Sequence, residues 1–206
     1  MLIHVGGWER GVRAEIFERM FRQRKRVFHD EKQWDVKVVD GEFEIDEYDR
    51  DDTAYLMSFD PSGAMVGSIR LLSTATPHMM SGPFGEMFPE VSFRSPAIWE
   101  ATRFVALGGC ALQPNGVSTA ACELLLGMCR FGLDHGMGHI TAVYDAGMAR
   151  LYRRCGLTHV ELGRHRTAEH GTVFVGLWEI SPALEDSILA ATGLERPASA
   201  LPSRAA

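Results

Sequence analysis

Charged side chains inside apolar or turn-like segments constrain the fold of this 206-residue chain more than any other feature. Burying an unpaired charge costs several kcal/mol, so Arg70, within the apolar run 66–72, needs a carboxylate partner. The set joins three arginines, three carboxylates and two large aromatic residues: Arg24, Phe28, Trp34, Asp46, Asp49, Arg70, Glu100 and Arg103. We expect them to converge on an ion-pair network that lines an aromatic-walled pocket for a small zwitterion carrying an amine, a carboxylate and a flat ring.

The composition is that of an ordinary globular protein, with 46% hydrophobic and 23% charged residues. The formal charge of −6 argues against a general nucleic-acid binder. Glu9, Arg10, Arg13 and Glu15 interrupt the opening segment, so we expect no signal peptide, and no apolar run is long enough to span a membrane. These features predict a cytoplasmic protein.

The four cysteines lack the close pairing typical of metal sites and redox motifs. Cys110, Cys122, Cys129 and Cys155 lie in or beside apolar segments. We therefore expect reduced, mostly buried thiols, without a disulfide or a metal site.

Hydrophobic periodicity predicts a single domain over 1–195 with a mixed α/β (α+β) sheet flanked by helices, and a disordered tail over 196–206. Predicted helices cover 14–28, 117–135 and 147–155, and predicted strands cover 54–59, 65–72, 98–107, 139–144, 157–162 and 173–180. The irregular stretch 29–50 is too long for a simple connector, which favours a functional loop or lid; 77–96 is also predicted as loop. This order of elements is found in acyl-group N-transferases of the GNAT type.

Glu100 and Arg103 lie three apart on one predicted strand. Side chains alternate faces along a regular strand, so these two share a site only if a bulge resets the register. The alternative is that each makes a separate cross-strand ion pair. A carboxylate beside an apolar strand surface can also have a raised pKa and act as a base.

The loop residues have simpler explanations when each is taken alone. Asp46 and Asp49 could belong to a solvated acidic loop, although either could pair with Arg70. Phe28 and Trp34 could be core residues. Trp34 lies in a polar segment, however, where an aromatic ring can cover a ligand ring or a sulfonium cation.

Taken together, the pattern resembles the acyl-homoserine lactone synthases, the autoinducer synthases of bacterial quorum sensing. The resemblance rests on Arg24-x3-Phe28, Trp34, Asp46-x2-Asp49, Arg70 and Glu100-x2-Arg103, within the strings RQRKRVFHDEKQW, EIDEYD, GSIRLL and WEATRF. It covers about residues 15 to 180.

The resemblance implies a GNAT-like, mainly antiparallel sheet with a bulged central strand, residues 1–50 forming the helix and lid and 51–195 the acyl-transfer core. It implies an acyltransferase that moves an acyl group from acyl carrier protein or coenzyme A to the amine of S-adenosylmethionine. Lactonisation then releases methylthioadenosine. No prosthetic group or metal is implied, and no cysteine belongs to the motif, which fits direct transfer.

The resemblance also assigns roles. Glu100 would take the proton of the ammonium through water, or would position Arg24 or Arg103. Backbone N–H groups near 103–105 would hold the oxyanion. The expected contacts of S-adenosylmethionine are Arg24, Phe28, Trp34, Arg103 and Phe104. Asp46, Asp49 and Arg70 would hold the lid closed and exclude water.

The acyl chain is expected between the strands 98–107 and 139–144, beneath the long helix. The predicted lining is Thr102, Val105, Thr141, Val143, Ala146 and Met148. Many members that make 3-oxo products carry Thr two residues before this Met; Ala146 disfavours a 3-oxo group and leaves unsubstituted, branched or aryl groups open.

The predicted helix 147–155 carries a basic cluster. Arg150, Arg153 and Arg154 would dock an acidic carrier protein, or would simply form a solvated helix end.

Two other functions compete with this interpretation. A GNAT-type acyl-coenzyme A N-acyltransferase on another amine is disfavoured, because 106–117 lacks a clear pyrophosphate loop. A non-catalytic module that binds S-adenosylmethionine or a thioester would not need Glu100. The sequence leaves open the acyl group, its donor and the oligomeric state.

Overall fold

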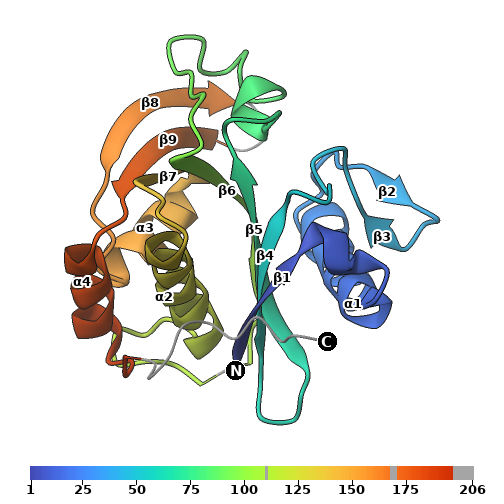
Figure 1. The fold of residues 1–206 in the computed structure, drawn as a ribbon, viewed down its shortest axis with the longest axis horizontal. Helices are drawn as coiled ribbons and strands as arrows, with labels where there is room; N and C mark the ends of the chain where they lie inside the picture. The colour runs from blue at the N-terminus through green and yellow to red at the C-terminus, as the bar shows by residue number, and fades with distance from the viewer. Residues whose placement is uncertain (110, 168–170, 197–206) are drawn as a thin grey trace.

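A seven-stranded sheet forms the centre of the computed structural model, which describes residues 1–109, 111–167 and 171–196. Neighbouring strands are antiparallel except for the parallel pair β6–β7 (Figure 1). In spatial order the strands are β1 (Leu2–Gly6), β4 (Ala54–Phe59), β5 (Met65–Ser73), β6 (Ile98–Ala106), β7 (His139–Asp145), β9 (Gly171–Glu179) and β8 (Val160–Thr167). The short strands β2 (Val38–Val39) and β3 (Phe43–Glu44) pair separately.

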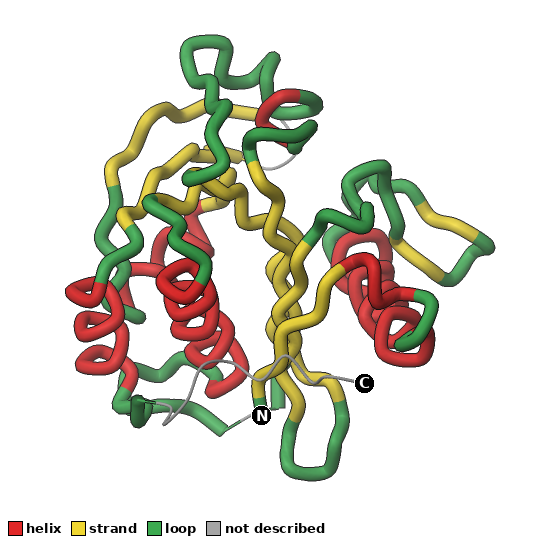
Figure 2. Tube along the Cα trace, viewed as in Figure 1, coloured by secondary structure: helices red, strands yellow, loops and turns green. Residues whose placement is uncertain are grey.

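Helices cover both faces of this sheet, which confirms the predicted mixed fold. One face carries α2 (Thr119–Asp134), α3 (Ala146–Arg154) and α4 (Pro182–Thr192), and we call it the α2 face (Figure 2). The opposite side, the α1 face, carries α1 (Ala14–Arg24) and the β2–β3 ribbon. Short helical turns are η1 (Gly7–Arg10), η2 (Lys25–Glu31) and η3 (Met79–Ser81).

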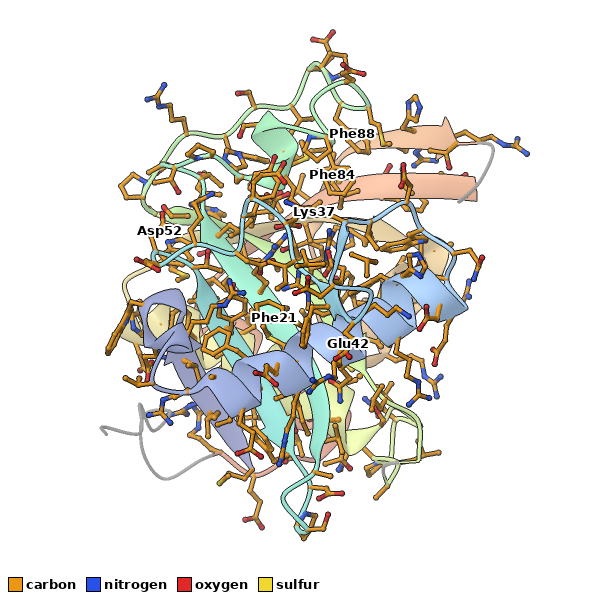
Figure 3. The ribbon with its side chains drawn as sticks, turned by 90° about the vertical axis from the view of Figure 1, so that its right-hand side faces the viewer. Phe21, Lys37, Glu42, Asp52, Phe84 and Phe88 are labelled. Atoms are coloured by element: carbon orange, nitrogen blue, oxygen red, sulfur yellow. The ribbon has the colours of Figure 1, made fainter. Side chains whose placement is uncertain are left out.

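Each face has its own apolar core. On the α2 face, Leu124, Leu125 and Cys129 of α2 are fully buried against Leu71 and Ile140 of the sheet. On the α1 face, aromatic residues of α1 pack on β1, β4 and β5; Phe21 lies over these strands in Figure 3. Phe84 and Phe88, labelled above it, belong to the 77–96 segment, which packs against β9.

Several element boundaries differ from the sequence prediction. The predicted helix 14–28 is an α-helix only to Arg24; it continues as one π-helical stretch, η2, to Glu31. The predicted strand 157–162 lies later, as β8. Of the predicted tail, 197–206 lies outside the described residues, and Arg196 forms an ion pair with Asp186 at 2.5 Å.

The sequence prediction missed β1 and α4. Helix α4 nevertheless has clear signals: Ser181 caps its N-terminus by accepting from the Leu184 N–H, Pro182 occupies the first turn, and Gly193 ends it with φ of 71°. The predicted reduced cysteines are free and buried at Cys122, Cys129 and Cys155; Cys110 lies outside the described residues.

Strand β6 has a bulge, as predicted. Ser68 and Arg70 of β5 pair with Val105 and Thr102, so β6 has one more residue than β5 between the two pairs. Arg103 lies in this interval with φ of 53°, in the left-handed region that is unusual for a residue with a side chain. The bulge places the side chains of Thr102 and Arg103 on the same face of the sheet, where both contact Arg70 or its ion-pair partners.

Strands β6 and β7 pair over only part of their length and then diverge. Their parallel ladder pairs Ile98 with His139 and ends where Glu100 pairs with Thr141, although both strands continue beyond this pair. The divergence forms a fork, with Glu100 at its base.

Candidate active site

Arg24 is the centre of a buried ion-pair network on the α1 face. Its Nε donates to Glu44 Oε2 at 2.5 Å, and its two terminal nitrogens donate to both oxygens of Asp49 at 2.7 and 3.0 Å. Only 1% of Arg24 is exposed. These carboxylates use the whole guanidinium fork, so Arg24 holds α1 to the loop that follows β3.

Two further arginines extend the network from the sheet. Arg70 forms a bidentate pair with Asp46 at 2.5 and 3.0 Å, and lies 3.1 Å from Asp49. Arg103 donates from Nε and Nη2 to Glu44 Oε1 at 3.0 and 2.9 Å, and from Nη2 to Asp46 Oδ2 at 3.0 Å. The network therefore joins α1, β3, β5 and β6 around one site.

Glu44 is the member that the sequence interpretation missed. It is fully buried and bridges Arg24 and Arg103 through its two oxygens. Glu44 lies in an acidic run, which is typical of a solvated loop, and so it was not recognised as a site residue. The spacing of two residues between Glu44 and Asp46, which places side chains on the same side of an extended segment, was the available signal. With Glu44 included, three guanidinium groups face three carboxylates, and the network is neutral.

The network shifts the pKa of Asp49 and of the neighbouring Tyr55. Burial opposes the ionisation of Asp49, but Arg24 and Arg70 outweigh it and hold the pKa of this carboxyl well below its usual range. Burial, together with the charge of Asp49, raises the pKa of Tyr55, whose hydroxyl donates to Asp49 Oδ1 at 2.8 Å.

Glu100 lies beside this network and differs from its carboxylates. Its Oε2 accepts hydrogen bonds from the N–H groups of Met79 at 2.7 Å and Met80 at 3.3 Å. Its Oε1 is buried and has no hydrogen-bond partner among the described residues. Burial raises the pKa of Glu100 to about 7, against the opposing effects of these N–H groups, Arg70 and Arg103. The carboxyl can thus gain or lose a proton near neutral pH.

Glu100 and Arg103 reach the same site. Met79, whose N–H binds Glu100, has its sulfur 3.6 Å from Arg103 Nη1 and 3.3 Å from Arg70 Nη2. The partners of Glu100 here are backbone N–H groups, so the alternative of a separate cross-strand ion pair does not describe it.

An aromatic pair borders the network. Phe28 and Trp34 stack with ring centroids 5.2 Å apart and an angle of 21° between their planes. The guanidinium carbon of Arg103 lies 5.5 Å from the Phe28 centroid. The turn after η2 brings the pair together, since the Trp34 N–H donates to the Phe28 carbonyl at 2.8 Å.

Two of the residues predicted to contact S-adenosylmethionine have other partners in the structure. Arg24 has its guanidinium fork filled by Glu44 and Asp49. Phe104 follows Arg103 and points to the opposite face, where it packs against the α2-face core. Alternation beyond the bulge explains this orientation.

An apolar cavity lies on the α2 face, beyond the fork. Its volume is about 10 Å3. The lining residues are Ile69, Ala101, Leu125, Met128, Ile140, Ala142, Tyr152, Leu157 and Trp178. Ala101 and Ala142 immediately follow Glu100 and Thr141, the last paired residues of the fork.

The predicted acyl lining does not form this cavity. The Thr102 hydroxyl accepts from Arg70 Nε at 3.0 Å on the α1 face. Thr141 and Val143 alternate with the cavity residues Ile140 and Ala142, and Val143 packs near Met80. The remaining predicted residues, Val105, Ala146 and Met148, are also absent from the lining, with Ala146 exposed at the start of α3. The cavity therefore lies on the predicted strands, but different residues of these strands line it.

Helix α3 carries the predicted basic cluster at the surface. Arg150, Arg153 and Arg154 are exposed, and Arg154 Nε donates to the Asn115 carbonyl at 2.9 Å. The side chain of Arg154 therefore holds α3 to the loop before α2.

Within 1–109, 111–167 and 171–196, no group of three or more His, Cys, Asp or Glu side chains is arranged to hold a metal ion. None of the helices in these ranges combines the length and the apolar character that crossing a membrane requires.

The forked sheet with helices on both faces defines a GNAT-like acyltransferase fold. A putative N-acetyltransferase from Lactobacillus plantarum shares this fold with a TM-score of 0.56 at 15% identity, over 87% of this chain and 99% of that one. The family model "Autoinducer synthase" matches residues 9–188. The chain belongs to the autoinducer synthase family, whose members are acyltransferase enzymes.

Individual relatives agree. An acyl-homoserine-lactone synthase from Rhizobium etli is 40% identical over 169 residues, which cover 80% of this chain and 77% of the relative. The coenzyme A-dependent acyl-homoserine lactone synthase MesI has a TM-score of 0.83 at 25% identity, covering 96% of this chain and 97% of MesI. TofI, solved with an inhibitor and MTA, has a TM-score of 0.72 at 26% identity, covering 88% of this chain and 91% of TofI.

Proposed function

We propose that this protein is an acyl-homoserine-lactone synthase. It transfers an acyl group from a thioester to the amine of S-adenosylmethionine and then forms the lactone, releasing methylthioadenosine (MTA), to make a quorum-sensing signal. The observation that carries the proposal is the buried Glu100 carboxyl, which has one unpartnered oxygen and lies at the base of the fork beside a guanidinium network. Family membership and the structure of TofI with MTA support the choice of substrate.

The site suits the charges of S-adenosylmethionine. Arg103 uses Nε and Nη2 on the network carboxylates, whereas Nη1 faces the Met79 sulfur as its one polar contact among the described residues, and it can donate to the substrate carboxylate. The stacked Phe28 and Trp34 offer aromatic faces to the adenine or the sulfonium. Because the network is neutral, the net positive charge of the bound substrate favours the ionised form of Glu100.

Acyl transfer then needs a base and an oxyanion site. Glu100 Oε1, through a water molecule, takes a proton from the substrate ammonium. The free amine attacks the thioester carbonyl, the C–S bond breaks, and the thiol leaves with a proton. In this proposal, backbone N–H groups at 103–105, beside the bulge, donate to the developing oxyanion. In the second step the substrate carboxylate attacks the carbon next to the sulfonium, and the C–S bond breaks to release MTA.

The fork gives the acyl group a route. With the thioester carbonyl near Glu100, the tail passes between β6 and β7 to the cavity on the α2 face, past Ala101 and Ala142. The small methyl groups of these alanines leave the entry open. Ala146, exposed at the start of α3, offers no hydroxyl to a 3-oxo group.

Either coenzyme A or acyl carrier protein could deliver the acyl group. The exposed arginines Arg150 and Arg153 on α3 would attract an acidic carrier and mainly increase its rate of association. We further propose that residues 1–195 act as one domain and that the enzyme works in the cytoplasm, where both substrates are made.

The test is a two-product assay with purified protein, S-adenosylmethionine and acyl thioesters of coenzyme A or of acyl carrier protein. We expect free thiol and MTA in equal amounts. Thiol release on another amine without MTA would indicate the rival N-acyltransferase, and no release of either product would indicate a binding module. Glu100→Gln should lower turnover by about 100-fold or more; unchanged turnover would discard Glu100 as the base.

A further inference from the structure

The apolar cavity has a rigid wall at Trp178 and a more flexible wall formed by α2, which we call the roof. Ala101, Ala142 and Trp178 stand on the adjacent strands β6, β7 and β9, so the lining residues reach from the fork to Trp178. Two strand spacings, roughly 10 Å, separate the strands that carry Ala101 and Trp178. Leu125 and Met128 of α2 line its roof; such flexible side chains can shift when a ligand enters.

Trp178 forms the rigid wall because aromatic rings pack against it on several sides. Its ring centroid lies 4.5 Å from His159, 5.0 Å from Tyr152 and 5.6 Å from Tyr144. Only 2% of Trp178 is exposed. The Tyr144 hydroxyl and His159 are hydrogen-bonded to each other, which fixes two of these rings. Moving Trp178 would therefore disrupt a whole cluster.

We propose that this enzyme takes a short acyl group, of the butanoyl to hexanoyl class, and that Trp178 is the residue that sets this limit. The inference rests on the proposed function. A longer chain would have to displace Trp178 from its packed cluster, because this ring closes the end of the lining that lies opposite the fork. A shorter chain needs only the roof to adjust. Each methylene that does not fit lowers kcat/KM by about 10-fold or more.

The first experiment measures kcat/KM for the wild type with butanoyl-, hexanoyl-, octanoyl- and decanoyl-coenzyme A, followed by thiol and MTA release. If coenzyme A esters are inactive, the same four acyl groups are tested on acyl carrier protein. We expect decanoyl to be at least 100-fold worse than the best short substrate. If decanoyl is the best substrate, the length limit is wrong while the proposed function stands. If no thioester yields MTA, the proposed function itself fails.

Variants then identify the limiting residue. Trp178→Leu should raise kcat/KM for decanoyl relative to butanoyl by at least 10-fold. Phe174→Leu is the matched control: Phe174 stacks on Tyr144 in the same cluster but does not line the cavity, so its variant should keep the wild-type order.

Two further measurements guard against unfolding. The rate with butanoyl and the circular dichroism spectrum report whether Trp178→Leu is folded; if it is not, the milder Trp178→Phe should still shift the preference towards longer chains.

Ala142→Val, which fills the entrance, should lower kcat/KM for hexanoyl more than for butanoyl. An unchanged order of substrates in a folded Trp178 variant would overturn the assignment.

Discussion

At the scale of single residues, two buried carboxyl groups at one site have opposite tasks. Glu44 is held between two guanidinium groups and serves as a fixed counter-charge. Glu100 is held by two backbone N–H groups, and burial raises its pKa to about 7, so it can exchange a proton. The neighbours of each carboxyl, rather than its residue type, decide its role.

Glu100→Gln should stabilise the protein more as the pH rises. The folded-state pKa of Glu100 is raised from 4.5 to about 7, so ionisation of Glu100 costs stability as the pH rises through this range. Glutamine keeps a carbonyl oxygen for the two N–H groups but carries no charge. We expect the variant's advantage in the free energy of unfolding to grow to about 3 kcal/mol above pH 7.

Urea unfolding at acidic, neutral and alkaline pH measures this advantage. The control is Glu179→Gln, an exposed carboxyl on β9. A constant difference between wild type and Glu100→Gln at all three pH values would contradict the raised pKa.

Glu44→Gln should damage both stability and binding of S-adenosylmethionine. It leaves Arg24 and Arg103 buried with too little negative charge, which costs about 3 kcal/mol. Because Arg103 also loses its anchor, KM for S-adenosylmethionine should rise at least 10-fold, roughly 1.4 kcal/mol. Steady-state kinetics and urea unfolding measure the two effects.

The matched control is Glu42→Gln, two residues earlier. Its side chain is 57% exposed and pairs with Arg22 at the surface, so its loss should cost about 0.5 kcal/mol or less. If the two variants behave alike, the bridging role of Glu44 is wrong.

At the scale of elements, the bulge in β6 and the fork between β6 and β7 build the site. The bulge places Arg103 beside Thr102 on the α1 face, and the fork begins at Glu100, where we propose that the acyl group passes to the α2 face. Close approach of the β5 and β6 backbones accompanies the bulge. Gly67 makes this possible, since a Cβ there would lie 2.7 Å from the Val105 carbonyl oxygen.

Gly67→Ala should therefore destabilise the protein by about 1–3 kcal/mol and lower turnover, because β6 must shift beside the oxyanion donors. Gly108→Ala is the control: a Cβ at Gly108 meets nothing within 4 Å. Thermal unfolding and the MTA assay compare the two variants. Equal stability of both would show that the approach of β5 and β6 is not tight.

The sequence predicted the elements well and their faces less well. Alternating apolar residues identified the strands, and the spacing of Glu100 and Arg103 pointed to a bulge. Successive side chains point to opposite faces, however, so a position one residue away in the strand lies on the other face. Thr102 precedes the bulge in β6, and Thr141 and Val143 lie on the regular strand β7; these residues alternate with the cavity residues Ala101, Ile140 and Ala142 and lie opposite the cavity. The sequence did not identify Glu44 for another reason. Its burial depends on Arg24 of α1 and Arg103 of β6, which are distant in the sequence.

At the scale of the whole molecule, the network binds the N-terminal segment to the sheet. Arg24 comes from α1 and Arg70 from β5, and Asp49 in the loop between β3 and β4 contacts both. Arg24 and Arg70 hold the pKa of Asp49 below its usual value, so Asp49 contributes stability above pH 3.8 that is lost as the pH falls below it.

Asp49→Asn should remove part of this acid sensitivity. The variant should be less stable than wild type at neutral pH, by about 3 kcal/mol, and the gap should narrow in acid. Urea unfolding over a pH series measures the gap. A gap that stays constant down to the most acidic pH would contradict the lowered pKa.

The most direct test of the central claim is the pH dependence of kcat/KM for MTA release. If Glu100 is the base, kcat/KM for the wild type rises with pH and reaches a plateau through an apparent pKa of about 7, and Glu100→Gln loses this inflection together with most of its activity. A wild-type profile without an inflection near neutral pH, or an active Glu100→Gln that keeps the inflection, would contradict the account.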